Sequence, residues 1–236
     1  MIGLTERLKS ILRLGLKPYR NEYSTTADLI EKARSSGDPF SGAPYYDIAE
    51  PDMEWQWETL IWPMIQGLDF SGVIDLAAGH GRNSVRLREH AGCLFIVDIN
   101  QECIDYCKKR FQGDERISYL KTNGVSLNGI RDNSISLVYS FDSMVHFHIE
   151  MIKEYLKEFY RVLKVGGHCF CHHSNYMGNP GGDFTKSPHW RNFMSKELFA
   201  HYSVMAGLEV VEQKVIDWSY PELDCLSVVR KPNLVR

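Results

Sequence analysis

Short apolar runs rich in β-branched residues alternate along this chain with segments whose apolar residues recur at helical spacing. Runs of the first kind are typical of buried strands, and segments of the second kind are typical of amphipathic helices. This alternation predicts an α/β fold with a doubly wound, mostly parallel sheet. The expected strands are Val73–Ala77, Leu94–Asp98, Ile117–Lys121, Ile135–Ser140 and His168–His173. The expected helices between them are Asn83–His90, Gln101–Phe111 and Ile149–Leu163.

The last of these helices and the segments after it predict how the sheet ends. Ile149–Leu163 has the clearest helical spacing, and Gly166 is expected to close this helix. A further helix over Lys196–Ala206 precedes two strand-like runs, Glu209–Asp217 and Leu226–Val229. No helical pattern separates these two runs, so we expect them to form an antiparallel pair.

The N-terminal quarter of the chain has a different pattern. Its first 20 residues predict a basic amphipathic helix, which packs on the protein or, as the alternative, lies on an anionic membrane surface. The residues after it are rich in turn-forming Gly and Pro. Four aromatic residues are candidates for a cap or for simple packing, namely Tyr45, Tyr46, Trp55 and Trp57. We therefore expect an N-terminal helix and cap segment over 1–52 and one larger domain over 53–236.

Composition and charge exclude several classes of protein. The formal net charge is -3 and the sequence pI is about 6.3, so the chain lacks the basic character of a nucleic-acid-binding protein. None of the six cysteines stands in a CxxC pair, and no apolar run is long enough to span a bilayer. We expect a cytoplasmic protein with reduced thiols, no integral membrane segment, no nucleic-acid partner and no metal, and homodimerisation stays open.

The stretch Val73–Ser84 carries the strongest local motif. A strand containing Asp75 is followed by Gly79 and Gly81 and then by a helical segment, which is the arrangement of a nucleotide-binding turn. Asp98 closes the next strand, where a carboxylate can accept from both hydroxyls of a ribose. The glycine spacing is close to the dinucleotide fingerprint, so a nicotinamide cofactor is one alternative. An acid before the glycines would repel a pyrophosphate, which favours a ligand with an amino or cationic group.

Five segments in this order carry a family resemblance: Asp75–Gly81, Val97–Ile99, Thr122–Gly124, Ser140–Ser143 and Tyr160–Gly167. Together they resemble the class I S-adenosylmethionine-dependent methyltransferases, in particular bacterial small-molecule and glycan-associated members. The resemblance covers roughly residues 54–230. It implies a Rossmann-like sheet of seven strands in the order 3-2-1-4-5-7-6 with the last strand antiparallel. It also implies S-adenosylmethionine as cofactor and S-adenosylhomocysteine as product.

The resemblance implies roles for the matched positions. Asp75 would face the amino group of the methionine portion through water or the turn backbone, and Asp98 would hold the ribose hydroxyls. Asn123 stands where the family has an acid, and its amide oxygen would accept from the adenine amino group. Ala77 stands where the family has its first glycine. The complete set of expected cofactor-binding residues is Asp75, Ala77, Gly79, Gly81, Asn83, Asp98, Ile99, Asn123, Gly124, Ser140 and Phe141.

Candidate catalytic residues follow the fourth and fifth strands. A hydroxyl acceptor must lose its proton, and histidine suits this role near neutral pH. His146 and His173 are the candidate bases, with packing or helix capping as the alternative role of His146. Side chains alternate along a strand, so only one of His172 and His173 faces the substrate, and His173 lies nearer the strand end. Asp142 is expected to orient a histidine or the substrate, or else to be a solvated loop acid.

These residues predict methyl transfer to a small molecule, with an oxygen of a sugar or glycan precursor as the expected acceptor. The alternatives are a nicotinamide-dependent oxidoreductase and a cofactor-binding protein without catalysis. Residues 176–188 form a segment long enough to be a lid or a substrate-binding loop. The identity of the acceptor does not follow from the sequence.

Overall fold

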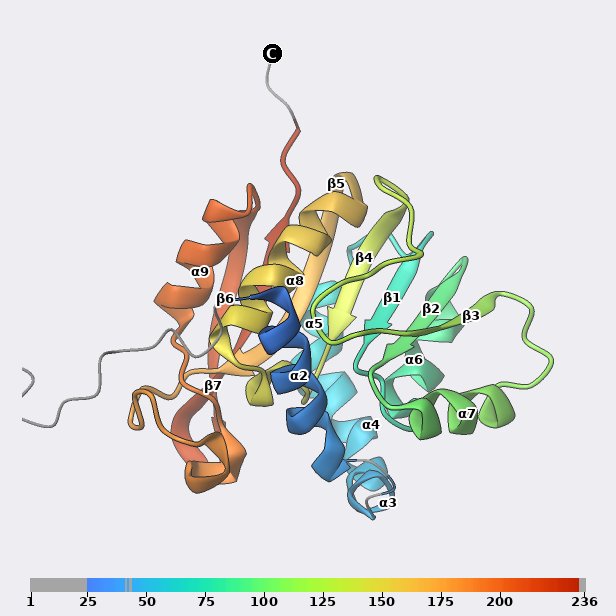
Figure 1. The fold of residues 1–236 in the computed structure, drawn as a ribbon. Coiled ribbons are helices and arrows are strands. Elements are labelled where there is room, and N and C mark those ends of the chain that lie inside the picture. Colours follow the sequence, from blue (N-terminus) through green and yellow to red (C-terminus); the bar gives the residue numbers. More distant parts are fainter. Residues whose placement is uncertain (1–24, 41, 43, 234–236) are drawn as a thin grey trace, which may run out of the picture.

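The protein is built around one seven-stranded sheet with helices on both faces (Figure 1). The computed structural model describes residues 25–40, 42 and 44–233, so the predicted helix in the first 20 residues lies outside the described part. The strand order is β3-β2-β1-β4-β5-β7-β6, and β7 runs in the opposite direction to the other six strands. This confirms the predicted fold class and order. The strands are β1 Val73–Leu76, β2 Leu94–Asp98, β3 Ile117–Lys121, β4 Ile135–Ser140, β5 Leu163–Ser174, β6 Glu209–Trp218 and β7 Tyr220–Arg230.

Each face of the sheet has its own hydrophobic core. On one face Ile61, Leu87 and Ile104 pack against strand residues such as Ile96. On the other face Leu156 packs against the strand residues that point to that side. The helices α8 and α9 cover this second face, and α2 lies beside α8 (Figure 1). The helices are α2 Thr26–Gly37, α3 Tyr45–Ala49, α4 Met53–Gln56, α5 Trp62–Ile65, α6 Arg82–His90, α7 Gln101–Arg110, α8 Ile149–Val162 and α9 Lys196–Met205.

The boundary between α8 and β5 differs from the prediction. The helix ends at Val162, because Leu163 is already extended and pairs with Ile135 of β4. Gly166 does not close the helix. It lies inside β5 with a φ of +79°, next to a shift of register between β4 and β5. Leu163 fitted the helical spacing because a buried strand residue is apolar too.

The two strands at the end of the sheet are longer than predicted. β6 and β7 form a hairpin in which Trp218 pairs with Tyr220 across Ser219. β7 then pairs with β5 over seven residues, from Ser174 opposite Asp224 to His168 opposite Arg230. The polar residues at the start of β7 hid it from the apolar pattern.

The described part of the segment before the sheet begins with α2, which lies at the carboxyl ends of the strands. Thr25 and Asp28 form a capping box at the start of α2. Leu29 and Ala33 then pack with Val125 and Met151 in a small third core. This places α2 over the ends of β2 and β3, where a ligand binds in open α/β sheets. The division of the chain at residue 52 stays a prediction.

Candidate functional site

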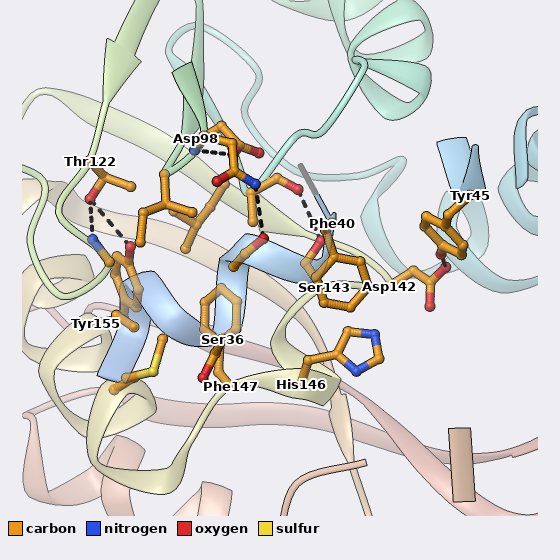
Figure 2. A pocket seen from close by; sticks show the side chains of 18 of the residues that line it. Ser36, Phe40, Tyr45, Asp98, Thr122, Asp142, Ser143, His146, Phe147 and Tyr155 are labelled. Atoms are coloured by element: carbon orange, nitrogen blue, oxygen red, sulfur yellow. Dashed lines mark hydrogen bonds between the residues drawn. The ribbon is translucent and has the colours of Figure 1, made fainter. Parts of the chain in front are cut away.

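A cavity lies beyond the carboxyl ends of β1, β2, β3 and β4, and we call it the cofactor cavity (Figure 2). Its position is the switch point of the strand order, because β2 and β4 lie on opposite sides of β1. Ligands of open α/β sheets bind at such points. Its lining residues are Ala33, Ser36, Gly37, Phe40, Tyr45, Tyr46, Leu76, Ala77, Asp98, Ile99, Asn100, Thr122, Gly124, Asp142, Ser143, His146, Phe147, Met151 and Tyr155.

The turn after β1 has the backbone that the glycine motif predicts. Gly79 has a φ of +56°, and a Cβ there would lie 2.3 Å from the Tyr46 ring. Ala77 also has a left-handed φ of +57°, although it carries a side chain in place of the family's glycine. Its N–H donates to Val97 O at 2.8 Å, and its carbonyl accepts from Ser143 Oγ at 3.0 Å. These hydrogen bonds hold the turn in a conformation that alanine alone disfavours.

Asp98 lies at the edge of the cofactor cavity. Its carboxylate accepts from Gly79 N at 2.9 Å and from Asn100 N at 2.8 Å. Burial raises the pKa of this carboxyl, and the backbone N–H donors partly offset that effect. Ile99 lines the cavity directly after it. The structure therefore brings a hydrogen-bond acceptor and an apolar wall to the place where a ribose and an adenine are expected.

Asp75 lies behind the turn and does not line the cavity. Its side chain is 1% exposed, and its carboxylate accepts from Ser84 Oγ at 2.5 Å. Burial is the main reason that its pKa is raised to about 7, with the nearby Asp98 adding to the effect. Contact with a bound amino group through water or the turn backbone stays a prediction.

The prediction that the Asn123 side chain reads the adenine is wrong. Its Oδ1 accepts from Val125 N at 3.1 Å, from Ser126 N at 2.9 Å and from Ser126 Oγ at 2.9 Å. The amide oxygen thus caps the loop that follows β3, in the local bonding that Asn favours in turns. Thr122 and Gly124 line the cavity instead (Figure 2).

Part of the predicted cofactor set lies beside the glycine turn. Phe141, Asn83 and Gly79 border a smaller hollow next to the cofactor cavity. Asn83 Oδ1 accepts from the Tyr139 hydroxyl at 2.9 Å, which fixes its orientation. Ser140 is fully buried and donates to Leu76 O at 3.1 Å, so its predicted place under the ligand is wrong. Gly81 is the N-cap of α6 and lines neither space.

Asp142 lines the cavity and belongs to an ion pair that the sequence did not predict. Its carboxylate accepts from Arg82 Nη2 at 2.8 Å and from the Tyr45 hydroxyl. The side chains of both ions are less than one tenth exposed, so the pair is shielded from solvent. Arg82 also donates to Gln56 Oε1 and to Ala49 O. The pair holds the Tyr45 ring at the mouth of the cavity (Figure 2).

His146 lines the cofactor cavity, as expected of a candidate base. Its Nδ1 lies 2.8 Å from Trp190 O, and a carbonyl only accepts, so Nδ1 carries the proton. Nε2 then keeps a free lone pair, and no hydrogen bond to it is found within the described ranges. Burial, with the charge of Arg191, lowers the pKa of His146 to about 4. The Phe40 ring lies 5.0 Å from the imidazole, and both rings border the cavity (Figure 2).

His173 is in the wrong place to be a base. It is fully buried on the α9 face of the sheet, and its ring lies 4.0 Å from that of Phe199. Its Nε2 bonds Ser227 Oγ at 2.8 Å. His172, the other member of the pair, contacts the loop after β4 through the N–H of Asp142.

His172 belongs to a buried polar network. Its Nδ1 accepts from the N–H of Asp142 at 3.1 Å, so Nε2 carries the proton and donates to Asp224 at 3.0 Å. Asp224 also accepts two hydrogen bonds from Arg191, at 2.9 and 2.6 Å. Hydrogen bonds from His172 and Arg191, with the charge of Arg191, hold the pKa of Asp224 at about 2 despite its burial. The network fixes the backbone of Asp142 and gives no free base to the cavity.

A second, more open hollow adjoins the cofactor cavity, and we call it the acceptor groove. Four residues line both spaces, namely Phe40, Tyr45, Asp142 and His146. Further lining residues of the groove are Pro39, Pro44, Ile48, Ala49, Asp52, Gln56, Arg82, His189, Trp190, Arg191 and Trp218. His189, Trp190 and Arg191 come directly after residues 176–188, and no residue of 176–188 itself lines the groove. The role of that segment as a lid or substrate-binding loop stays a prediction.

The part of the site that sequence reasoning missed is α2. Ala33, Ser36 and Gly37 form a wall of the cofactor cavity, although this segment was expected only to contain turns. The signal was present, because Thr25 and Asp28 have capping-box spacing before an apolar face.

In the part of the chain that the structure describes, no helix is long and apolar enough to cross a membrane. The same residues contain no group of three or more potential metal ligands.

Comparison with known proteins agrees with this geometry. Residues 73–167 match a family described as a methyltransferase domain. A ubiquinone/menaquinone biosynthesis C-methyltransferase of Zymomonas mobilis is 28% identical over 151 residues. The aligned part covers 60% of this chain and 60% of that relative.

Solved structures share the fold at low sequence identity. A methyltransferase of Haloferax volcanii, solved with the Trm112 methyltransferase activator, is 20% identical with a TM-score of 0.63, covering 82% of this chain and 98% of its own. An S-adenosylmethionine-dependent methyltransferase of Mesorhizobium loti is 15% identical with a TM-score of 0.57, covering 72% and 96%. The [4+2]-cyclase SpnF is 15% identical with a TM-score of 0.61, covering 78% and 82%.

The residues around the cofactor cavity fit S-adenosylmethionine. Asp98 supplies an acceptor for ribose hydroxyls, Ile99 and Met151 supply apolar walls, and the turn at Gly79 lets the backbone come close. Ser36 adds a buried hydroxyl that has no partner among the described residues. Residues 73–167 therefore resemble a methyltransferase domain, and the cavity that they help to form fits S-adenosylmethionine as a cofactor.

Proposed function

We propose that this protein transfers the methyl group of S-adenosylmethionine to a small molecule held in the acceptor groove. The observation that carries the proposal is the wall shared by the two spaces, which contains His146 and Asp142. A methyl acceptor must lie in contact with the cofactor, and adjoining spaces with a common wall allow this. Such orientation alone can supply about 7–11 kcal/mol of the barrier reduction.

The cofactor supplies an activated methyl group, and the residues of the chain do the rest. Asp98, Gly79 and the walls of the cavity bind and orient the cofactor. His146 Nε2 takes the proton of the acceptor, since Nδ1 is already committed to Trp190 O. The pair between Arg82 and Asp142 holds the Tyr45 ring at the boundary and limits the entry of water.

The groove favours an acceptor with a flat face and an ionisable hydroxyl. Phe40, Trp190 and Trp218 line it, and such rings bind apolar faces of sugars or of phenols. A sugar or glycan oxygen, expected from the sequence, is compatible with these walls. The Zymomonas mobilis relative is named as a C-methyltransferase of quinone biosynthesis, so carbon acceptors belong in the same test. A cytoplasmic location and a homodimer stay predictions.

The test is a screen with methyl-labelled S-adenosylmethionine against sugars, nucleotide sugars, phenols and quinol precursors. We expect one class to receive the label and His146→Ala to lower its turnover by about 10²–10⁴-fold. The dissociation constant for S-adenosylhomocysteine should change little, because the base serves the acceptor. Cofactor binding without label transfer to any class would favour a different chemistry on this fold, as the name of SpnF illustrates. Binding of a nicotinamide cofactor in its place would contradict the proposal.

A further inference from the structure

The hydroxyl of Ser36 is buried in the wall of the cofactor cavity without a partner. Ser36 lies in the last turn of α2 and is 8% exposed. Its Oγ is shielded from solvent and has no hydrogen bond to any residue in the described part of the chain. Buried polar groups almost always have a partner, so one that faces a cavity calls for a ligand or a bound water.

The contacts of α2 place this hydroxyl between the ends of β2 and β3. Gly37, the next residue, accepts from Asn100 Nδ2 at 3.1 Å, in the loop that follows Asp98. Ala33, three residues earlier, lies against Gly124, in the loop that follows β3. Ser36 is therefore held beside the part of the cavity that the Asp98 and Gly124 loops enclose, and Figure 2 shows it on the α2 wall.

Another hydroxyl that lines the cavity is already committed. Thr122 Oγ1 donates to Ser126 O at 2.6 Å and accepts from Gly124 N at 3.2 Å. Phe147 and Met151 supply only apolar surface nearby. Ser36 thus offers a donor and an acceptor that no described residue uses.

We propose that the Ser36 hydroxyl hydrogen-bonds the adenosine portion of S-adenosylmethionine, so that α2 takes part in cofactor recognition. The inference rests on the cofactor assignment made above. Ser36 is a binding residue, outside the strand-end motifs, and it is not required to touch the acceptor.

The experiment compares Ser36→Ala with Ser35→Ala as the matched control. The Ser35 hydroxyl is exposed and bonds Lys32 O within the same helix. Calorimetry measures the dissociation constants of S-adenosylhomocysteine and of 5′-methylthioadenosine, which lacks the amino and carboxyl groups. We expect Ser36→Ala to raise both constants by the same factor, about three- to tenfold, and Ser35→Ala to leave both unchanged. Urea unfolding without ligand should be unaltered by Ser36→Ala, or shifted to higher urea, because the hydroxyl has no partner to lose.

The outcomes separate this inference from the proposed function. If the wild-type protein binds S-adenosylhomocysteine and Ser36→Ala binds it equally well, the role of Ser36 is refuted and the cofactor assignment stands. If the wild-type protein does not bind it, the cofactor assignment itself fails. If Ser36→Ala raises the dissociation constant of S-adenosylhomocysteine but not that of 5′-methylthioadenosine, the hydroxyl lies at the methionine portion and the adenosine contact is refuted. Loss of ligand-free stability in Ser36→Ala would mean that the hydroxyl serves the fold.

Discussion

Replacing Gly124 by alanine tests whether α2 is part of the cofactor site. Gly124 has a φ of +88°, and a Cβ there would lie 2.4 Å from Ala33 Cβ and 2.9 Å from Ile99 Cδ1. Ala33 Cβ cannot rotate away, since it is fixed to the α2 backbone. Restoring an ordinary contact of 3.4 Å therefore requires the helix to move by about 1 Å. We expect Gly124→Ala to displace α2 from the loop after β3.

The expected loss of stability has two parts. A side chain at left-handed φ costs about 1–2 kcal/mol, and overpacking of the α2 contact costs about 1–3 kcal/mol more. Gly113→Ala is the matched control, because Gly113 has a φ of +90° and nothing within 4 Å of a Cβ. Gly113→Ala should therefore lose only the stability due to the left-handed φ. The difference in the free energy of unfolding between the two variants then measures the cost of the contact with Ala33.

Urea unfolding gives the two free energies, and hydrogen exchange of residues 26–37 reports on α2 itself. Gly124→Ala should speed exchange in α2 and weaken S-adenosylhomocysteine binding by at least tenfold, whereas Gly113→Ala should do neither. Equal stability losses in the two variants, with unchanged exchange in α2, would refute the argument that this helix is packed against Gly124.

Three further predictions concern buried titratable groups. The pKa of His146 is lowered to about 4, so kcat/KM should stay constant from about pH 5.5 to 7.5 and fall only near pH 4. Initial rates measured across this range give the profile, and an inflection near pH 6.5 would refute the role of His146 as the base. Asp224→Asn should lower the free energy of unfolding by about 3–5 kcal/mol at pH 7, because Arg191 stays buried without its anion, and a urea midpoint equal to wild type would contradict it. The pKa of Asp75 is raised to about 7 in the folded state, above its unfolded value of about 4. The contribution of Asp75 to the free energy of unfolding is therefore greatest below pH 4, and it decreases by about 1.4 kcal/mol per pH unit as the pH rises to 7. Asp75→Asn should remove that slope, which urea unfolding of both proteins at pH 5 and 7 measures.

The sheet and the cofactor motifs could be predicted because their signals are local. The strands from Leu94–Asp98 to Ile135–Ser140 have the predicted bounds, since each is a short apolar run between turn residues. Asp98 ends β2, and Gly79 lies in the turn directly after β1. Parallel pairing of the two strands is therefore enough to bring them together at one edge of the sheet.

Other assignments failed because they depend on tertiary contacts. The burial of His173 follows from Phe199 on α9, which packs against that face of β5 and removes the ring from any ligand. Asn123 bonds its own loop, and local bonding of this kind competes with a ligand for the same amide oxygen. The pairing of Asp142 with Arg82 joins positions sixty residues apart, and no spacing rule relates them.

The acceptor side of the site is built from segments that share no motif. Arg82 connects it to the cofactor side, because it starts α6 directly after the glycine turn and its guanidinium pairs with Asp142 in the groove. The same carboxylate holds Tyr45, and the N–H of Asp142 donates to the buried His172. Asp142 also has a left-handed φ of +57°, a strained conformation that these partners maintain. The buried ion pair thus joins the start of α6, directly after the glycine turn, to the wall that the cofactor cavity and the acceptor groove share.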